Sequence, residues 1–235
     1  MRLFFASRIP KWYFNFTVSF FLVLVLLPGI LEYVITDPNK PKPFYNGNMA
    51  KPQVAFACNV FWGEEYLPQM LETFARHNIK VTFFIGGSWA ARHPDLVKLI
   101  AESGHELANH SYTHPHPNTL TKEKNKEQIT RTEALVQELT GVKTTIYAPP
   151  YGEFNDTVLA AAAELGYITT LWSIDTVDWK KPSPEVIIAR VTKKLHNGAI
   201  ILMHPTEPTA KALPELISRI EDGGYTILPV SSILE

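Results

Sequence analysis

From residue 53 onward, short apolar runs alternate with longer amphipathic stretches, and this alternation limits the folds that are open to the chain. A buried strand reads as a continuous apolar run, whereas a helix that packs on a sheet is apolar on one side only. Repeated strand–helix units with short loops indicate a parallel sheet with helices outside it, as an open sheet or a barrel. The predicted strands are 54–58, 81–85, 145–147, 168–172, 199–203 and 226–228, and the predicted helices are 66–77, 94–103, 122–140, 156–165, 184–195 and 210–222.

Capping residues support these boundaries. Asn155 and Ser183 stand where a side chain can cap a helix start, and Gly141 and Gly166 directly follow predicted helices. Parallel α/β folds place their active sites at the carboxyl ends of the strands. We therefore expect functional side chains directly after the predicted strands.

The N-terminal part of the chain has the composition of a membrane anchor. Residues 12–31 contain no charged side chain, which suits a helix that spans a bilayer. Three basic residues precede this segment and two acidic ones follow it, so the positive-inside rule leaves the N-terminus in the cytoplasm. We predict a cytoplasmic N-terminus and signal anchor in 1–35, a proline-rich linker in 36–52 and one extracytoplasmic domain in 53–235. A cleavable signal peptide, which would release a secreted domain, is the alternative.

Charge and cysteine content exclude some functions. The formal net charge is −1 and no long run of like charges occurs, so nothing favours nucleic acid as a partner. The single cysteine, Cys58, excludes an internal disulfide, and its place in an apolar run indicates a packing residue. The sequence leaves the oligomeric state open.

Two histidines follow the short apolar run 106–108. His110 and His114 are four residues apart, so one helical turn would bring both imidazoles to one side. Neutral imidazole binds zinc, cobalt or nickel. Two such histidines can equally be hydrogen-bonded structural groups, and from this cluster alone both interpretations stay open.

Two further clusters follow predicted strands. The double proline Pro149-Pro150 gives a rigid turn, which either is structural or aims a backbone N–H at an oxyanion. Asp175 and Asp178 lie beside Trp179, where they could orient a base or hold a sugar ring, or simply cap and pack a turn.

The fourth cluster is a histidine at the end of the strand 199–203. His204 is a candidate general acid or base, although a lone histidine is often structural. Polar groups at four separate strand ends are more informative together than singly. They indicate a site at this edge of the sheet.

These motifs resemble those of the polysaccharide deacetylases, the NodB-homology domain of carbohydrate esterase family four, over about residues 53–235. The resemblance implies a distorted (β/α) barrel of about seven parallel strands, here preceded by the transmembrane helix. It also implies a hydrolase that removes N-acetyl groups, by cleaving amide bonds, from a cell-wall glycan such as peptidoglycan or a chitin-like polymer. The matching segments are His110-Ser111-Tyr112-Thr113-His114, Pro149-Pro150-Tyr151-Gly152, Asp178-Trp179 and Leu202-Met203-His204.

The resemblance also implies a role for each matching residue. His110 and His114 would hold a divalent metal, zinc first, with cobalt or nickel as alternatives, which would polarise the carbonyl and activate water. His204 would be the general acid, tuned by Asp178, and the backbone N–H of Tyr151 would bind the oxyanion. The side chains expected to contact substrate are Trp179, Leu202, Trp62 and Pro150.

Three positions depart from the family pattern. In a gapless match, Asn59 stands where the family has its base aspartate, and Val60 where it has its metal-binding aspartate. Ala148 replaces the arginine that steadies the base. An amide is no useful base and a valine ligates no metal, so base, metal ligand and arginine are lost together.

Two glutamates near the altered motif could replace the missing carboxylate. We expect Glu65 or Glu64 to act as ligand or base, against the alternative that both only favour the positive end of the following helix. The run from Asn59 to Tyr66 resembles a divergent branch of the family in spore-forming bacteria.

Three functions follow from this reading. The first is a divergent metal-dependent deacetylase of cell-wall glycan. The second is a catalytically inactive protein that binds glycan or serves wall assembly, using Trp62, Trp179 and Tyr151 to hold sugar. The third is another metal-assisted hydrolase on the same scaffold, because a fold does not fix a function.

Overall fold

The computed structural model describes residues 40–234, and Pro41–Glu235 form one compact unit. The predicted signal anchor lies outside the described residues. Within 40–234, no helix combines the length and the apolar character that crossing a membrane requires.

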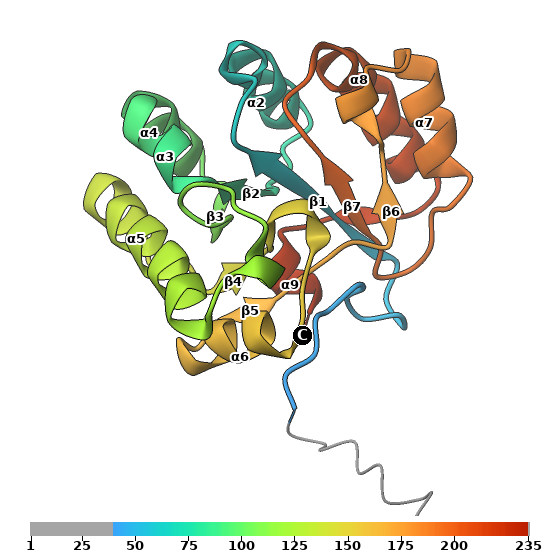
Figure 1. Cartoon of the computed structure of the whole chain (residues 1–235). Helices are drawn as coiled ribbons and strands as arrows, with labels where there is room; N and C mark the ends of the chain where they lie inside the picture. Colours follow the sequence, from blue (N-terminus) through green and yellow to red (C-terminus); the bar gives the residue numbers. More distant parts are fainter. Residues whose placement is uncertain (1–39, 235) are drawn as a thin grey trace, which may run out of the picture. The chain divides into compact units, whose positions relative to one another are not determined.

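A curved sheet of parallel strands forms the centre of the compact unit (Figure 1). Its strands are β1 (Gln53–Val60), β2 (Thr82–Ile85), β3 (Glu106–Asn109), β4 (Ile146–Tyr147), β5 (Ile168–Thr169), β6 (Ile174–Asp175), β7 (Ile200–Met203) and β8 (Thr226–Ile227). Seven of them follow the order β5-β4-β3-β2-β1-β7-β6, and β8 pairs with the start of β1. The end strands β5 and β6 do not pair with each other in this part of the chain, so the sheet is a curled half-barrel. The predicted α/β fold with about seven parallel strands is confirmed, with one side of the barrel open.

All the described helices except α9 cover the outer face of the sheet (Figure 1). The α-helices are α2 (Leu67–Arg76), α3 (Gly87–Arg92), α4 (Pro94–Glu102), α5 (Lys122–Thr140), α6 (Asp156–Glu164), α7 (Pro184–Thr192), α8 (Glu207–Asp222) and α9 (Val230–Ile233). Short 3-10 turns are η1 (Glu64–Tyr66), η2 (Pro117–Thr119), η3 (Pro150–Gly152) and η4 (Asp178–Lys180). Helix α8 begins before the predicted residue 210, because the Thr206 side chain caps it by accepting from the Thr209 N–H at 3.2 Å.

The sequence prediction missed strand β6 and the short helices α3 and α9. The six-residue helix α3 is too short to show a helical period, and it follows β2 almost directly. Strand β6 is only two residues long, and the apolar run 168–172 concealed the loop that separates it from β5.

The central strand β1 divides its side chains between two cores. Phe56, Cys58 and Val60 point to the helices and join the large outer core. Ala55 and Ala57 point to the other face, where they pack with α9. Because strand side chains alternate, the next residue on this inner face is Asn59, at the carboxyl end of β1. The alternation therefore separates Asn59 from Val60, which is fully buried among apolar side chains.

The proline-rich segment before β1 is held against the domain from residue 41 onward, although its composition indicated a linker. The Phe44 N–H donates to the Thr169 carbonyl at 2.9 Å, and the Gly47 N–H donates to Gly198 at 2.8 Å. The Asn48 N–H donates to the Ile233 carbonyl at 2.7 Å. We call residues 44–48 the strap, because they join β5, the loop before β7, and α9 by backbone hydrogen bonds that composition does not reveal.

Candidate active site

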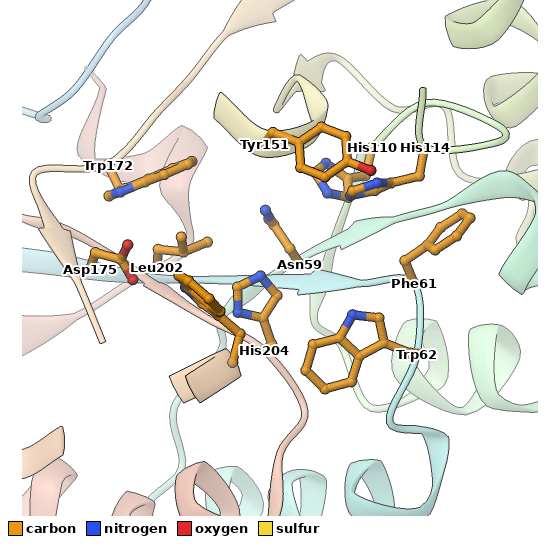
Figure 2. Close-up of a pocket in the computed structure, with 11 residues that line it drawn as sticks. Asn59, Phe61, Trp62, His110, His114, Tyr151, Trp172, Asp175, Leu202 and His204 are labelled. Carbon is orange, nitrogen blue, oxygen red and sulfur yellow. The ribbon is translucent and has the colours of Figure 1, made fainter. Parts of the chain in front are cut away.

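A cleft of about 430 Å³ lies at the carboxyl ends of the strands and gathers most of the side chains selected from the sequence (Figure 2). His110 directly follows β3, and His204 directly follows β7. This is the position expected for a site in a parallel fold. The lining residues are Asn59, Phe61, Trp62, His110, His114, Tyr151, Trp172, Asp175, Trp179, Leu202 and His204.

His110 is held in one tautomer. Its side chain is buried, and Nδ1 lies 2.7 Å from the Ala148 carbonyl oxygen. Since a carbonyl only accepts, Nδ1 carries the proton and Nε2 keeps a free lone pair. Burial, followed by the neighbouring His114, lowers the pKa of His110 to about 3, so the ring is neutral at physiological pH.

His114 sits among aromatic rings. Its ring centroid lies 4.9 Å from that of His110, 4.6 Å from Tyr151 and 4.8 Å from Phe61. Burial is the main cause that lowers the pKa of His114. The two imidazoles lie together in the cleft as predicted, but a loop brings them there and not the helical turn that the four-residue spacing suggested.

In the loops around the cleft, several non-glycine residues have left-handed backbone conformations. Ser111 has φ 64°, His114 φ 56° and Tyr151 φ 60°, and Val177, directly before Asp178, has φ 53°. Such conformations cost free energy outside glycine and cluster at functional sites. The strained turn at Tyr151 also places its ring against His116, with centroids 4.2 Å apart.

His204 is fixed by a buried carboxylate. Its Nδ1 lies 2.8 Å from Asp178 Oδ1, and its backbone N–H donates to Asp178 Oδ2 at 2.6 Å. The Thr209 hydroxyl donates to the same Oδ2 at 2.6 Å. Asp178 is fully buried, so these bonds satisfy a charge that water cannot reach. The His204–Asp178 pair can hold or donate a proton toward the cleft.

Exposed aromatic side chains border the cleft. Trp62, Trp179 and Tyr151 are 42%, 52% and 55% exposed. Trp62 stacks on the His204 ring, with centroids 5.6 Å apart and an interplanar angle of 10°. Flat apolar faces with polar edges suit the faces of sugar rings. This border can therefore hold a glycan chain across the cleft.

Asn59 occupies the floor of the cleft. It is 6% exposed, and its Oδ1 has no hydrogen-bond partner among the described residues. Figure 2 shows its side chain directed into the cleft that His110, Tyr151 and His204 also line.

Comparison with known proteins identifies the scaffold. The polysaccharide deacetylase family model matches residues 46–170. The peptidoglycan-N-acetylglucosamine deacetylase of Bacillus cereus is 32% identical over 196 residues, which cover 81% of this chain and 71% of that protein. The chain belongs to the polysaccharide deacetylase family. The resemblance inferred from the motifs is thus confirmed, and the deacetylases of this family are hydrolases that act on amide bonds.

Two other proteins are similar to this deacetylase-family chain. The uncharacterised protein YlxY of Bacillus subtilis is 46% identical over 196 residues, which are 83% of this chain but only 61% of YlxY. The structure of wild-type BA3943, a CE4 family pseudoenzyme from Bacillus anthracis, superposes with a TM-score of 0.82 at 39% identity. That match covers 83% of this chain and 69% of BA3943, and a mutant of BA3943 is described as having restored enzymatic activity.

The other altered family positions carry no functional group into the cleft. Val60 is completely buried in the outer core, so its side chain reaches neither water nor the cleft. Ala148 packs in the inner core and contributes only its carbonyl, which fixes His110. Among the described residues that line the cleft there is no arginine to stand in for the one that the resemblance implies before the double proline.

The glutamates expected to supply the missing carboxylate lie elsewhere. Glu64 and Glu65 line a separate hollow of about 390 Å³ on the other side of Trp62. Glu64 accepts from Trp89 Nε1 at 3.4 Å and lies 3.8 Å from His93 Nε2. This geometry contradicts the expectation that either glutamate completes a metal site with the cleft histidines, because the turn η1 directs them away from it.

Deacetylases of this family are generally metal-dependent, so the donor set of the cleft can be tested against a metal. Within 40–234, no group of three or more His, Cys, Asp or Glu side chains is placed to hold a metal ion. Catalytic zinc takes three protein ligands, whereas the cleft offers the two imidazoles of His110 and His114. The described residues therefore do not fit a catalytic metal, and zinc, cobalt or nickel at this pair stays a prediction.

Some cleft residues carried weak sequence signals. Asp175 belongs to the cluster noted after the strand 168–172, and it lines the cleft. Trp172 and Phe61 also line the cleft but were not selected from the sequence. Thr209 lies far from Asp178 in the sequence, so no local pattern could connect them. Pro150, expected to contact substrate, is buried and is not part of the lining.

Proposed function

We propose that this chain binds N-acetylated cell-wall glycan, with peptidoglycan as the first candidate, and that its cleft holds the glycan without efficient hydrolysis. The observation that carries the proposal is the amide of Asn59 in the position of the family's base, together with the burial of Val60 in the outer core. Among the described residues, the cleft keeps a binding surface for the glycan, but it has no carboxylate at the position of Asn59 and no third metal ligand beside His110 and His114.

The shape and chemistry of the cleft support a glycan ligand. Trp62, Tyr151 and Trp179 offer exposed rings for sugar faces, and Leu202 gives an apolar contact for an acetyl methyl group. His204 and Asp175 offer polar atoms for hydroxyl groups. Relatives named as peptidoglycan deacetylases make the same class of polymer the reasonable ligand here.

A second candidate function is metal-dependent N-deacetylation of the same glycan. It is favoured by the free Nε2 of His110 beside His114, and by the His204–Asp178 pair that the family would use as its acid. These groups alone do not complete a catalytic metal site. A ligand supplied by the substrate or from outside the described residues would be required.

The location and the whole protein's partners also remain proposals. The apolar segment 12–31 and the charges around it support a single-pass anchor that leaves the domain on the outer side of the cell membrane. That location would bring the cleft to its glycan. The aligned region is 61% of YlxY, so further partners of such a protein are not carried over from it.

One experiment separates the two functions. The full-length chain is incubated with peptidoglycan and with N-acetylglucosamine oligomers, with zinc, cobalt or nickel added, and both released acetate and bound glycan are measured. We expect binding without metal-dependent acetate release. Acetate release that depends on metal and is lost in His110→Ala would establish the deacetylase instead.

The aromatic border gives a matched test of binding. Removing the Trp179 ring should weaken glycan affinity about two- to tenfold, from the stacking contribution of one aromatic ring. The control is Val186→Ala, which shortens an exposed apolar side chain on α7 and should leave the affinity unchanged. Equal affinities for Trp179→Ala and the wild type would contradict a sugar-binding border.

A further inference from the structure

The amide oxygen of Asn59 is an unsatisfied polar atom at the floor of a mainly aromatic cleft. Its Oδ1 lacks a partner within the described part of the chain, although the residue is 6% exposed. A buried polar atom without a partner costs free energy, and native structures usually pair such atoms with protein, water or a ligand. Oδ1 itself has almost no exposed surface, but the side chain as a whole points into the cleft and lines it, so a ligand there meets the amide group (Figure 2).

A primary amide and a carboxylate recognise different ligands. Asparagine offers one acceptor oxygen and one donor NH₂ group without charge, whereas aspartate offers only acceptors and a negative charge. An acetamido group, with its C=O and N–H, can pair with either end of the Asn59 amide. A free amine of a de-N-acetylated sugar becomes an ammonium, which pairs best with a carboxylate.

The other side chains around Asn59 also favour a neutral, acetylated ligand. Trp172 and Leu202 form apolar walls, and the His110 ring is buried with its Nδ1–H turned to the Ala148 carbonyl. An ammonium would lose its hydration in this cleft. One carboxylate, Asp175, lines it, but one of its oxygens already accepts from the Val177 N–H at 2.7 Å.

We infer that Asn59 makes the cleft a reader of the acetylation state of glycan: it binds the acetamido group of an N-acetylated sugar and discriminates against the free amine. The inference rests on the proposed glycan-binding function and specifies its ligand. The replacement that removes the base thereby converts a catalytic position into a specificity position.

The test compares two probes of equal length by calorimetry, in EDTA so that no metal-dependent turnover occurs. These are the pentamer of N-acetylglucosamine and the pentamer of glucosamine. We expect the wild-type chain to bind the acetylated pentamer about tenfold more tightly. Asn59→Leu, close in size but without the amide, should lose about three- to tenfold of that affinity, the contribution of one hydrogen bond.

Two further variants keep the test decisive. Asn59→Asp, which preserves shape, should shift the preference toward the glucosamine pentamer by attraction of the ammonium. Asp175→Asn should increase the preference for the acetylated pentamer, because it removes the carboxylate that can pair with an amine. Thermal unfolding of each variant identifies any that fails to fold. If Asn59→Leu fails to fold, the change of preference in Asn59→Asp decides the test.

The outcomes separate this inference from the proposed function. If the wild type binds neither pentamer nor peptidoglycan, the glycan-binding function fails. If it binds the acetylated pentamer and folded Asn59→Leu binds it equally well, or if Asn59→Asp leaves the preference unchanged, Asn59 is not a reader and only this inference falls.

Discussion

Thr209 supports the buried pair Asp178–His204 from outside the cleft. The stability that is lost when its hydroxyl group is removed can be worked out from the geometry. The Thr209 hydroxyl donates to Asp178 Oδ2 at 2.6 Å, and both residues are almost completely buried. A hydrogen bond to a charged group contributes roughly 1.5–3 kcal/mol, and burial leaves no water to replace it. Thr209→Val, which has the same shape, should therefore reduce the free energy of unfolding by about that amount.

The assay is thermal and urea unfolding of Thr209→Val beside Thr209→Ser. For a domain of this size, the loss corresponds to a decrease in Tm of about 3–12 °C. Thr209→Ser keeps the hydroxyl and loses one buried methyl group, so we expect a loss of only about 1 kcal/mol. If the valine variant is as stable as the serine variant or the wild type, the bond to Asp178 does not stabilise the fold as argued.

Two further predictions concern stability. His105 is buried and accepts the Val81 N–H through Nδ1 at 3.2 Å, and burial is the main cause that lowers its pKa to about 4. The unfolded chain therefore binds the proton first, so the contribution of His105 to the unfolding free energy should fall by about 3 kcal/mol as pH decreases from about 6.5 to 4. His110 and His114, whose pKa values are also lowered, add a dependence of the same sign, so in urea titrations the total fall should become smaller in His105→Gln by about that amount. Val60→Asp, offered as a repair of the family motif, should destabilise the fold by about 2 kcal/mol or more, because it buries a carboxylate in the outer core. Asn59→Asp, on the cleft side, should cost less in the same thermal scan, and the reverse order would contradict the assignment of faces along β1.

The motifs predicted much of the site because each lies where a strand ends. His110, Tyr151 and His204 came from separate segments, and a parallel sheet has its carboxyl ends at one edge, so they meet in one cleft. The pairing of His204 with Asp178 likewise followed from the resemblance and is present at 2.8 Å.

The sequence did not reveal the directions of some side chains or the contacts between residues that are far apart in the chain. The distance of Glu65 from Asn59 along the chain is short, but the turn η1 carries the glutamate into a different hollow. The opening between β5 and β6 depends on strand pairing over the whole sheet, which no local pattern encodes. The unpartnered amide of Asn59 is visible only once the surrounding side chains are placed.

The strap formed by residues 44–48 has a mechanical consequence. Its bonds to Thr169, Gly198 and Ile233 tie it to three segments that lie far apart in the sequence. Tension applied to the chain before residue 41 would reach these attachments ahead of β1. Several backbone hydrogen bonds would share the load. The strap would therefore take up a pulling force before it reaches the cleft at the other end of β1.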